Sequence, residues 1–121
     1  AALEEAGNAV LAEKHYRHAL ALEPTRAQSW YGLGNVCLAQ GRLREARKYF
    51  LQAVRLDRLN AFAHYGLGRV ALEEKRREAA AWSFVRCLRI KPDFAPARVE
   101  IDRLRPFLPV GFWEDSEIAR D

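Results

Sequence analysis

The most reactive side chains in this sequence are two cysteines and two closely spaced histidines. Cys37 and Cys87 each lie in an apolar helical pattern, where a free cysteine behaves as a small buried hydrophobe. His15 and His18 are three residues apart and would share one helix face. A zinc site needs further ligands, and no Cys-x-x-Cys or His-Glu-x-x-His pattern supplies them. We therefore predict structural thiols and no metal site.

No combination of residues in the sequence predicts catalysis. There is no nucleophile paired with a base and no carboxylate pair at a recognisable spacing. Gly32 and Gly34 lie inside a helical pattern, so they do not form a phosphate-binding loop. The sequence therefore predicts a protein that is not an enzyme and that needs no cofactor.

The chain is mildly basic, and its charge is unevenly distributed. The net charge is +4, but four of the 16 acidic residues and one of the 20 basic residues lie in residues 114–121, which leaves residues 1–113 at +7. This balance favours acidic partners, including the chain's own tail. The basic runs at 42–48 and 75–77 are interleaved with or flanked by glutamates, so we interpret them as solvated surface and predict no nucleic-acid binding. The apolar runs are too short for membrane insertion.

A shift of 34 residues superimposes the chain on itself. The sequence Tyr-Gly-Leu-Gly at 31–34 recurs at 65–68. Small, aromatic and aliphatic positions recur in three copies: Ala12, Ala46 and Ala80; Tyr16, Phe50 and Phe84; Ala19, Ala53 and Cys87; Leu22, Leu56 and Ile90. Because residues 34 positions apart agree in size, aromaticity and turn chemistry, the sequence predicts a repeat architecture.

Each copy has the pattern of two helices joined by a short turn. Apolar residues recur every three or four positions over 28–40 and 42–57, and again over 62–74 and 77–90. Gly41 suits a left-handed helix end, and Lys75 is its counterpart in the next copy. Residues 1–6 are expected to be the end of a separate first helix. The predicted fold class is all-α, with antiparallel helix pairs.

This spacing resembles the tetratricopeptide repeat (TPR) family. The residues at the family's positions are Trp30, Leu33, Gly34, Cys37, Ala46, Phe50 and Ala53 in one copy, and His64, Leu67, Gly68, Ala71, Ala80, Phe84 and Pro92 in the next. Three of them depart from the family pattern: His64 replaces its Trp, and Cys37 and Ala71 replace its Tyr. The resemblance covers about residues 1–105 and implies a right-handed α-solenoid. It would comprise a half repeat at 1–26, full repeats at 27–60 and 61–94, and a terminal helix at 95–105. The apolar, then acidic, tail at 106–121 is expected to cap the last helix face.

The recurring small and aromatic residues suggest how such a stack would pack. Gly34 and Gly68 would let the two helices of a pair cross closely, because they carry no side chain. Tyr16, Phe50 and Phe84 are expected to fill the space between one pair and the next.

The resemblance also implies a binding groove. In the family, one stripe on the first helix of each pair lines a concave groove that holds extended peptides or partner helices. Carried over by position, the groove residues are Gln28, Tyr31, Asn35, Phe62, Tyr65, Arg69, Val99 and Arg103. Aromatic rings offer contact area at low entropic cost, Asn pairs with a peptide backbone, and Arg binds carboxylates. The alternative is that these aromatic rings pack within the stack.

The sequence therefore predicts a non-enzymatic, cytoplasmic protein-interaction module. Its partner would be a peptide or protein segment, with acidic residues as one favoured chemistry. The alternative is an accessory TPR domain of a larger polypeptide, for example an enzyme, that recruits substrate or drives self-assembly. The absence of methionine and the truncated first repeat favour that alternative. The tail could also mediate self-association or occupy a groove.

Overall fold

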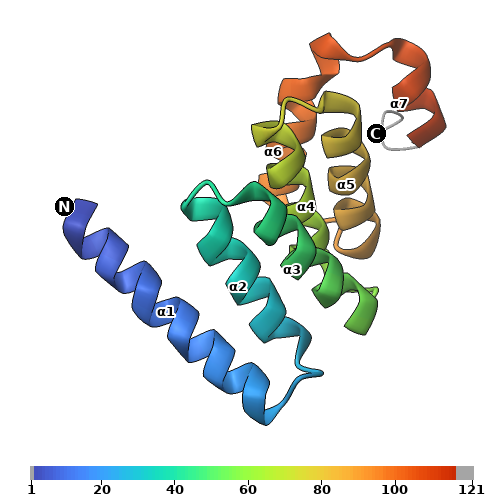
Figure 1. Ribbon diagram of the computed structural model, residues 1–121. Helices are drawn as coiled ribbons and strands as arrows, with labels where there is room; N and C mark the ends of the chain where they lie inside the picture. Colours follow the sequence, from blue (N-terminus) through green and yellow to red (C-terminus); the bar gives the residue numbers. More distant parts are fainter. Residues whose placement is uncertain (1, 117–121) are drawn as a thin grey trace. The chain divides into compact units, whose positions relative to one another are not determined.

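The computed structural model describes residues 2–116 and divides the chain into two compact units, Ala1–Arg58 and Leu59–Asp121. Within the described residues the structure contains seven α-helices, one short 3-10 helix and no strand (Figure 1). The first unit holds α1 (Ala2–Leu22), α2 (Ala27–Ala39) and α3 (Leu43–Leu56). The second holds α4 (Ala61–Glu73), α5 (Arg77–Ile90), α6 (Ala95–Leu104), the 3-10 helix Arg105–Phe107 and α7 (Val110–Ser116). The all-α prediction is confirmed.

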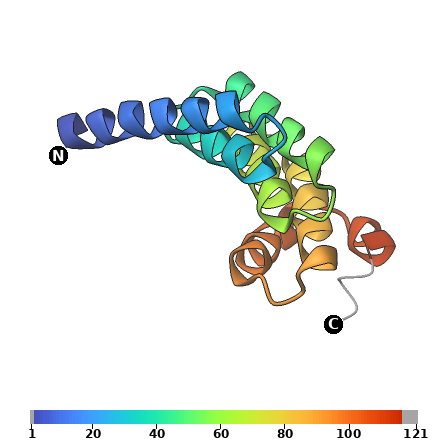
Figure 2. The ribbon, with the colours of Figure 1, turned by 90° about the horizontal axis from the view of Figure 1, so that it is seen from below.

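The first unit begins with a single long helix. The expectation that residues 1–6 form the end of a separate helix is wrong, because α1 runs from Ala2 to Leu22 (Figure 2). A glycine in a helix interior lowers stability without breaking the helix, so Gly7 alone does not force a turn. α1 then packs on α2, and α2 runs antiparallel to α3 (Figure 1).

In both helix pairs, the first helix ends in the same kind of turn. Gly41 follows α2 with φ +74°, and Lys75 follows α4 with φ +62°. After α2, the Gly41 N–H donates to the Leu38 carbonyl and the Arg42 N–H to the Cys37 carbonyl. The equivalent bonds close α4, from Lys75 and Arg76. Both turns are therefore Schellman motifs, which place the next helix antiparallel to the first.

Each pair is held together by a phenylalanine packed on a glycine. A Cβ atom on Gly34 would lie 2.5 Å from a ring atom of Phe50, and one on Gly68 would lie 2.5 Å from a ring atom of Phe84. Both rings are fully buried. The prediction that these glycines allow close crossing within a pair is confirmed. The described ring contacts of Phe50 and Phe84 lie inside their own pairs, whereas the Tyr16 ring reaches from α1 to Gly32 of the next helix.

The second unit ends with a segment that folds back on α5. Phe112 lies 5.0 Å from Trp82 between ring centroids and 4.9 Å from Trp113, in edge-to-face geometry in both cases. Phe112 and Trp113 are buried in the same hydrophobic cluster as Phe84 and Leu88. Apolar residues 112 and 113 thus complete this core, while residues 117–121 of the acidic tail lie outside the described residues.

Candidate functional site

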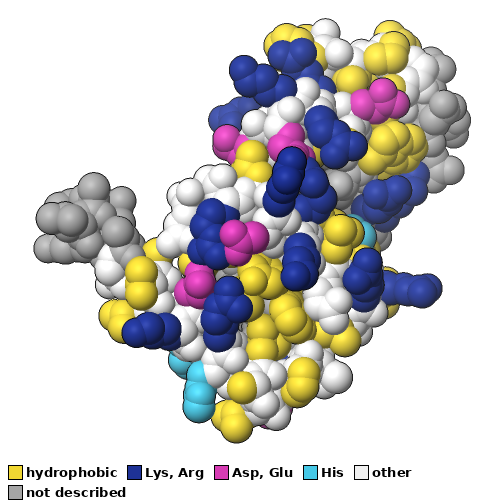
Figure 3. All heavy atoms as spheres, in the orientation of Figure 1, with side chains coloured by type: hydrophobic (Ala, Val, Ile, Leu, Met, Phe, Trp, Pro, Cys, Tyr) yellow, Lys and Arg dark blue, Asp and Glu magenta, His cyan; other side chains and the backbone are white. Residues whose placement is uncertain are grey.

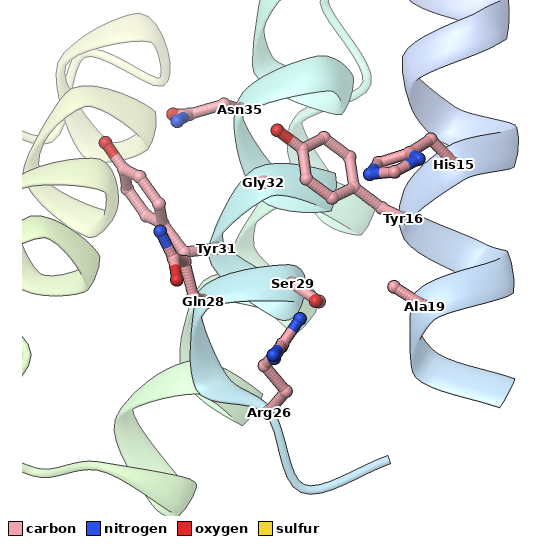
Figure 4. Close-up of a pocket in the computed structure, with 9 residues that line it drawn as sticks. All are labelled: His15, Tyr16, Ala19, Arg26, Gln28, Ser29, Tyr31, Gly32 and Asn35. Carbon is pink, nitrogen blue, oxygen red and sulfur yellow. The ribbon is translucent and has the colours of Figure 1, made fainter. Parts of the chain in front are cut away.

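The predicted groove residues of the first unit share one face of α2. Gln28, Tyr31 and Asn35 point to the side of α2 away from α1, whereas Ser29 and Gly32 face α1 (Figure 4). Tyr31 is half-buried, because its ring packs 5.8 Å from the ring of Phe50. The Oδ1 atom of Asn35 is buried and accepts no hydrogen bond from the described residues. Its amide therefore retains unused hydrogen-bonding capacity.

The second unit carries an aromatic cluster around α4. Phe62 is 46% exposed, and Tyr65 is half-buried. Both rings meet Phe94 edge-on, at centroid distances of 5.3 Å and 5.1 Å. Tyr65 also packs 5.7 Å from Phe84. The two aromatic side chains that the second unit adds to the predicted groove are thus partly packed on the core and partly exposed.

Two cations lie over these rings. The Lys91 Nζ atom is 5.5 Å from the centre of the Phe62 ring, and the Arg69 guanidinium is 5.8 Å from the centre of the Tyr65 ring. Both cations are exposed, so their charges stay available to an anion while the rings hold them in place. Arg69 and Tyr65 are one turn apart on α4, as the repeat pattern predicted.

Arg103 lies in a different environment from Val99, although both belong to α6. Val99 is 46% exposed and does not line the pocket to which Arg103 belongs. Arg103 lines a pocket of about 350 Å³ together with Leu72, Lys75, Arg77, Glu100, Leu104 and Phe107. Its guanidinium pairs with Glu100 at 3.0 Å. The Arg77 guanidinium lies 4.6 Å over the Phe107 ring, and the lining as a whole combines three apolar side chains with three cations and one carboxylate.

Sequence reasoning missed Phe94 and Lys91 beside the aromatic rings, and Lys75 and Arg77 in the pocket of Arg103. Phe94 occupies the position that Asn60 holds one repeat earlier, where the Asn60 side chain caps α4 by accepting a hydrogen bond from the Ala63 N–H. The repeat comparison contained the signal, an aromatic residue in place of a capping residue. Lys75 and Arg77 belong to a run whose mixed charge indicates solvated surface.

The residues with potential metal or redox chemistry lie elsewhere. Both cysteines are free and buried. Burial raises the pKa of the Cys37 thiol, and it raises the pKa of Cys87 to about 12, so both remain protonated near neutral pH. Among residues 2–116, no three His, Cys, Asp or Glu side chains are grouped so as to hold a metal ion.

Charges on the visible surface are mixed. Figure 3 shows Lys and Arg side chains scattered over this face with Asp and Glu among them. In the first unit, Arg42 pairs with Glu13 at 2.7 Å and also with Glu45. Arg17 pairs with Glu13 and donates a hydrogen bond to the Tyr49 hydroxyl at 3.1 Å. The charges of Arg42 and Arg17 are therefore balanced locally by glutamates. None of the helices in the described part of the chain combines the length and apolarity needed to cross a bilayer.

Comparison with known proteins agrees with this geometry. Residues 27–60 match the family model of the tetratricopeptide repeat. The structure is similar to the Arabidopsis OM64 TPR domain, with TM-score 0.79, 23% identity and 88% of each chain covered. It is also similar to a mutant Thermobaculum terrenum O-GlcNAc transferase, with TM-score 0.79 and 22% identity, and to MamA, with TM-score 0.72 and 22% identity. The predicted resemblance to the TPR family and its helical-repeat fold are confirmed.

The extent of these matches differs. The alignment covers 88% of this chain but 21% of the transferase chain, and 86% of this chain but 60% of the MamA chain. This chain thus spans about a fifth of the transferase. No curated protein matches the chain in sequence.

Proposed function

We propose that this TPR-like chain is a non-enzymatic protein-interaction module, and that its second unit binds an extended peptide containing both an apolar and an acidic residue. The observation that carries the proposal is the pairing of two aromatic rings of α4, Phe62 and Tyr65, with two exposed cations, Arg69 on α4 and Lys91 at the end of α5. Phe62 lies beneath Lys91, and Tyr65 beneath Arg69. A peptide would place an apolar side chain on the rings and a carboxylate against the cations.

The basic pocket supports the acidic part of this proposal. Arg103 lines it together with Lys75 and Arg77. Glu100 already pairs with Arg103, so an incoming carboxylate would gain most from Lys75 and from the open edge of Arg77. A planar guanidinium can bind a carboxylate through two hydrogen bonds, which fixes the orientation of the peptide.

Taken by itself, the first unit offers only uncharged contacts. Tyr31 offers part of its ring, and the Asn35 amide can pair with a peptide N–H or carbonyl group. Gln28 lies at the exposed start of the same face. An affinity near 1 μM, about −8 kcal/mol, would be ordinary for a surface of this size.

Binding can be tested with fluorescein-labelled 12-residue peptides that carry one aromatic or leucine residue and zero, one or three glutamates. We expect anisotropy to show tighter binding as glutamate is added, and a loss of at least about tenfold in the Arg69→Ala, Phe62→Ala double variant. The matched control is Arg86→Ala with Leu11→Ala, which removes one exposed arginine and one exposed aliphatic residue from α5 and α1. Equal affinities in the double variant, the control and the unaltered chain would refute the proposal.

A second candidate function is recruitment within a larger polypeptide. The similarity to part of an O-GlcNAc transferase chain favours it, since that chain joins such repeats to other sequence. In that case the same α4 surface would bind a substrate segment. The full-length gene product would then carry a further domain, and its activity on a protein substrate would fall in the Arg69→Ala, Phe62→Ala variant while its activity on a minimal substrate would not.

A further inference from the structure

The pocket around Arg103 is built from three segments of the second unit, and each segment supplies one cation. Lys75 lies in the turn between α4 and α5, Arg77 begins α5, and Arg103 belongs to α6. Glu100 adds a carboxylate to the lining of this pocket of about 350 Å³. Three cations and one carboxylate give the lining a formal charge of +2. A single bound carboxylate would balance half of that charge.

Lys75 has a backbone conformation that disfavours lysine. Its φ is +62°, and the equivalent turn of the first unit has a glycine, Gly41, at φ +74°. Because glycine adopts positive φ without a steric cost, the turn alone does not call for a lysine. A residue held in a disfavoured conformation at a pocket indicates a role for its side chain, and the Lys75 side chain lines the pocket.

The two arginines of the pocket are held in place but remain accessible. The Arg77 guanidinium lies 4.6 Å over the Phe107 ring. Arg103 pairs with Glu100 at 3.0 Å, yet 71% of the Arg103 side chain is exposed, against 19% of the Glu100 side chain. A phosphoryl group has three terminal oxygens and a charge of about −1.5 to −2 near pH 7. It therefore matches the number of cations and the charge of the lining better than a carboxylate does.

We propose that this pocket binds a phosphorylated serine or threonine of an extended peptide. The inference rests on the proposed function, because it names the acidic group that the same surface would recognise. Lys75, Arg77 and Arg103 approach the terminal oxygens of the phosphoryl group from three segments, and Glu100 keeps its pairing with Arg103. The apolar side chain of the peptide stays on the aromatic rings of α4.

The length of α4 sets the spacing between the two recognised residues of the peptide. Leu72 lines the pocket, and Phe62 lies in the aromatic cluster 10 positions earlier on the same helix. Ten positions of α-helix span about 15 Å. An extended peptide covers that distance in about four or five residues. The phosphorylated residue should therefore lie four or five positions from an aromatic or aliphatic residue.

The test uses fluorescein-labelled 12-residue peptides that carry serine, glutamate or phosphoserine four positions from a leucine. At pH 7.5 and 0.15 M salt, we expect anisotropy to show at least about fivefold tighter binding of the phosphoserine peptide than of the glutamate peptide. The second ionisation of phosphoserine has a pKa of about 6, so this advantage should shrink to about twofold or less at pH 5. Equal affinities of the two peptides at pH 7.5 would overturn the proposal.

A variant of the turn tests the pocket without threatening the fold. Lys75→Gly removes one cation and supplies the residue that Gly41 provides in the other turn. We expect the ratio of the phosphoserine affinity to the glutamate affinity to fall below about two. The matched control is Arg76→Ala, which removes an adjacent exposed cation that does not line this pocket. An unchanged ratio in Lys75→Gly, or an equal fall in the control, would contradict the proposal.

Failure of this inference can be told from failure of the proposed function. If the glutamate peptide binds and the Arg69→Ala, Phe62→Ala variant weakens it, while phosphorylation adds nothing, the phosphate inference alone is wrong. If none of the three peptides binds, both are wrong. Vesicles containing phosphoinositides that displace the labelled phosphoserine peptide at a lower phosphate concentration than the unlabelled peptide does would assign the pocket to a membrane instead.

Discussion

The helix pair of the first unit and that of the second unit share a scaffold but differ in what they expose. Gly34 faces Phe50 in one and Gly68 faces Phe84 in the other, and in both an added Cβ atom would lie 2.5 Å from the ring. On the first helix of each pair, Gln28 and Asn35 become Phe62 and Arg69. The buried contact between glycine and phenylalanine is therefore kept, while these two predicted groove positions change from uncharged polar to aromatic and cationic. In the proposed function, the second unit would therefore supply the contacts to an acidic residue.

The largest expected effect is loss of the buried rings. Phe50→Ala and Phe84→Ala should each lower the free energy of unfolding by about 3–5 kcal/mol, because each leaves a cavity against a glycine that cannot fill it. Urea denaturation followed by circular dichroism measures both. A loss below about 1 kcal/mol in either variant would mean that the two pairs are not built alike.

The next effect tests close approach within a pair. Gly68→Ala should cost about 1–3 kcal/mol, because the added methyl group meets the buried Phe84 ring. Gly111→Ala is the control: a Cβ atom there has no neighbour within 4 Å, and alanine should stabilise α7 by up to about 1 kcal/mol. Thermal unfolding of the two variants should therefore shift in opposite directions.

The two turns have different residues at the position with positive φ, Gly41 in one and Lys75 in the other, and each can be replaced. Lys75 adopts a left-handed conformation that disfavours residues with a Cβ atom, so Lys75→Gly should stabilise the protein by about 0.5–1 kcal/mol. Gly41→Ala should destabilise it by about 1 kcal/mol for the same reason. Denaturation midpoints check both signs, and a loss of stability in Lys75→Gly would contradict the turn geometry.

The smallest effect is electrostatic and belongs to the first unit. The hydrogen bond from Arg42 holds the pKa of the Glu13 carboxyl below its ordinary value of 4.5. A carboxyl group whose pKa is lower in the folded state than in the unfolded state stabilises the folded state. This stabilisation is complete when the pH is above the pKa of the unfolded state, and it is lost as the pH falls through the pKa of the folded state. Glu13→Gln should therefore lower the Tm by roughly 1–3 °C at pH 7 and by less at pH 3. An equal shift at both pH values would show that the charge is not responsible.

Much of the fold could be predicted because the repeat ties local pattern to packing. The helix predicted over 77–90 has the same bounds in the structure, and the pattern over 28–40 corresponds to α2 at Ala27–Ala39. The continuity of α1 through Gly7 could not be predicted, since the repeat register indicates a turn there.

The candidate surface could be predicted only in part. Periodicity placed Tyr65 and Arg69 on one face, because residues four apart on a helix are neighbours. It could not place Arg103 beside Lys75 and Arg77, which lie on other segments. Nor could it predict that Phe112 would meet Trp82, because an apolar tail must be buried but its composition does not select a face.

Each unit contains a single buried thiol, Cys37 in the first and Cys87 in the second. A thiol reagent can reach either sulfur only when the surrounding helices separate. The rates at which the two cysteines are labelled under native conditions therefore measure the opening of each unit independently, without any engineered probe. They also set a practical condition for handling the protein, since oxidation of these thiols would follow partial unfolding and would trap the chain in an opened state.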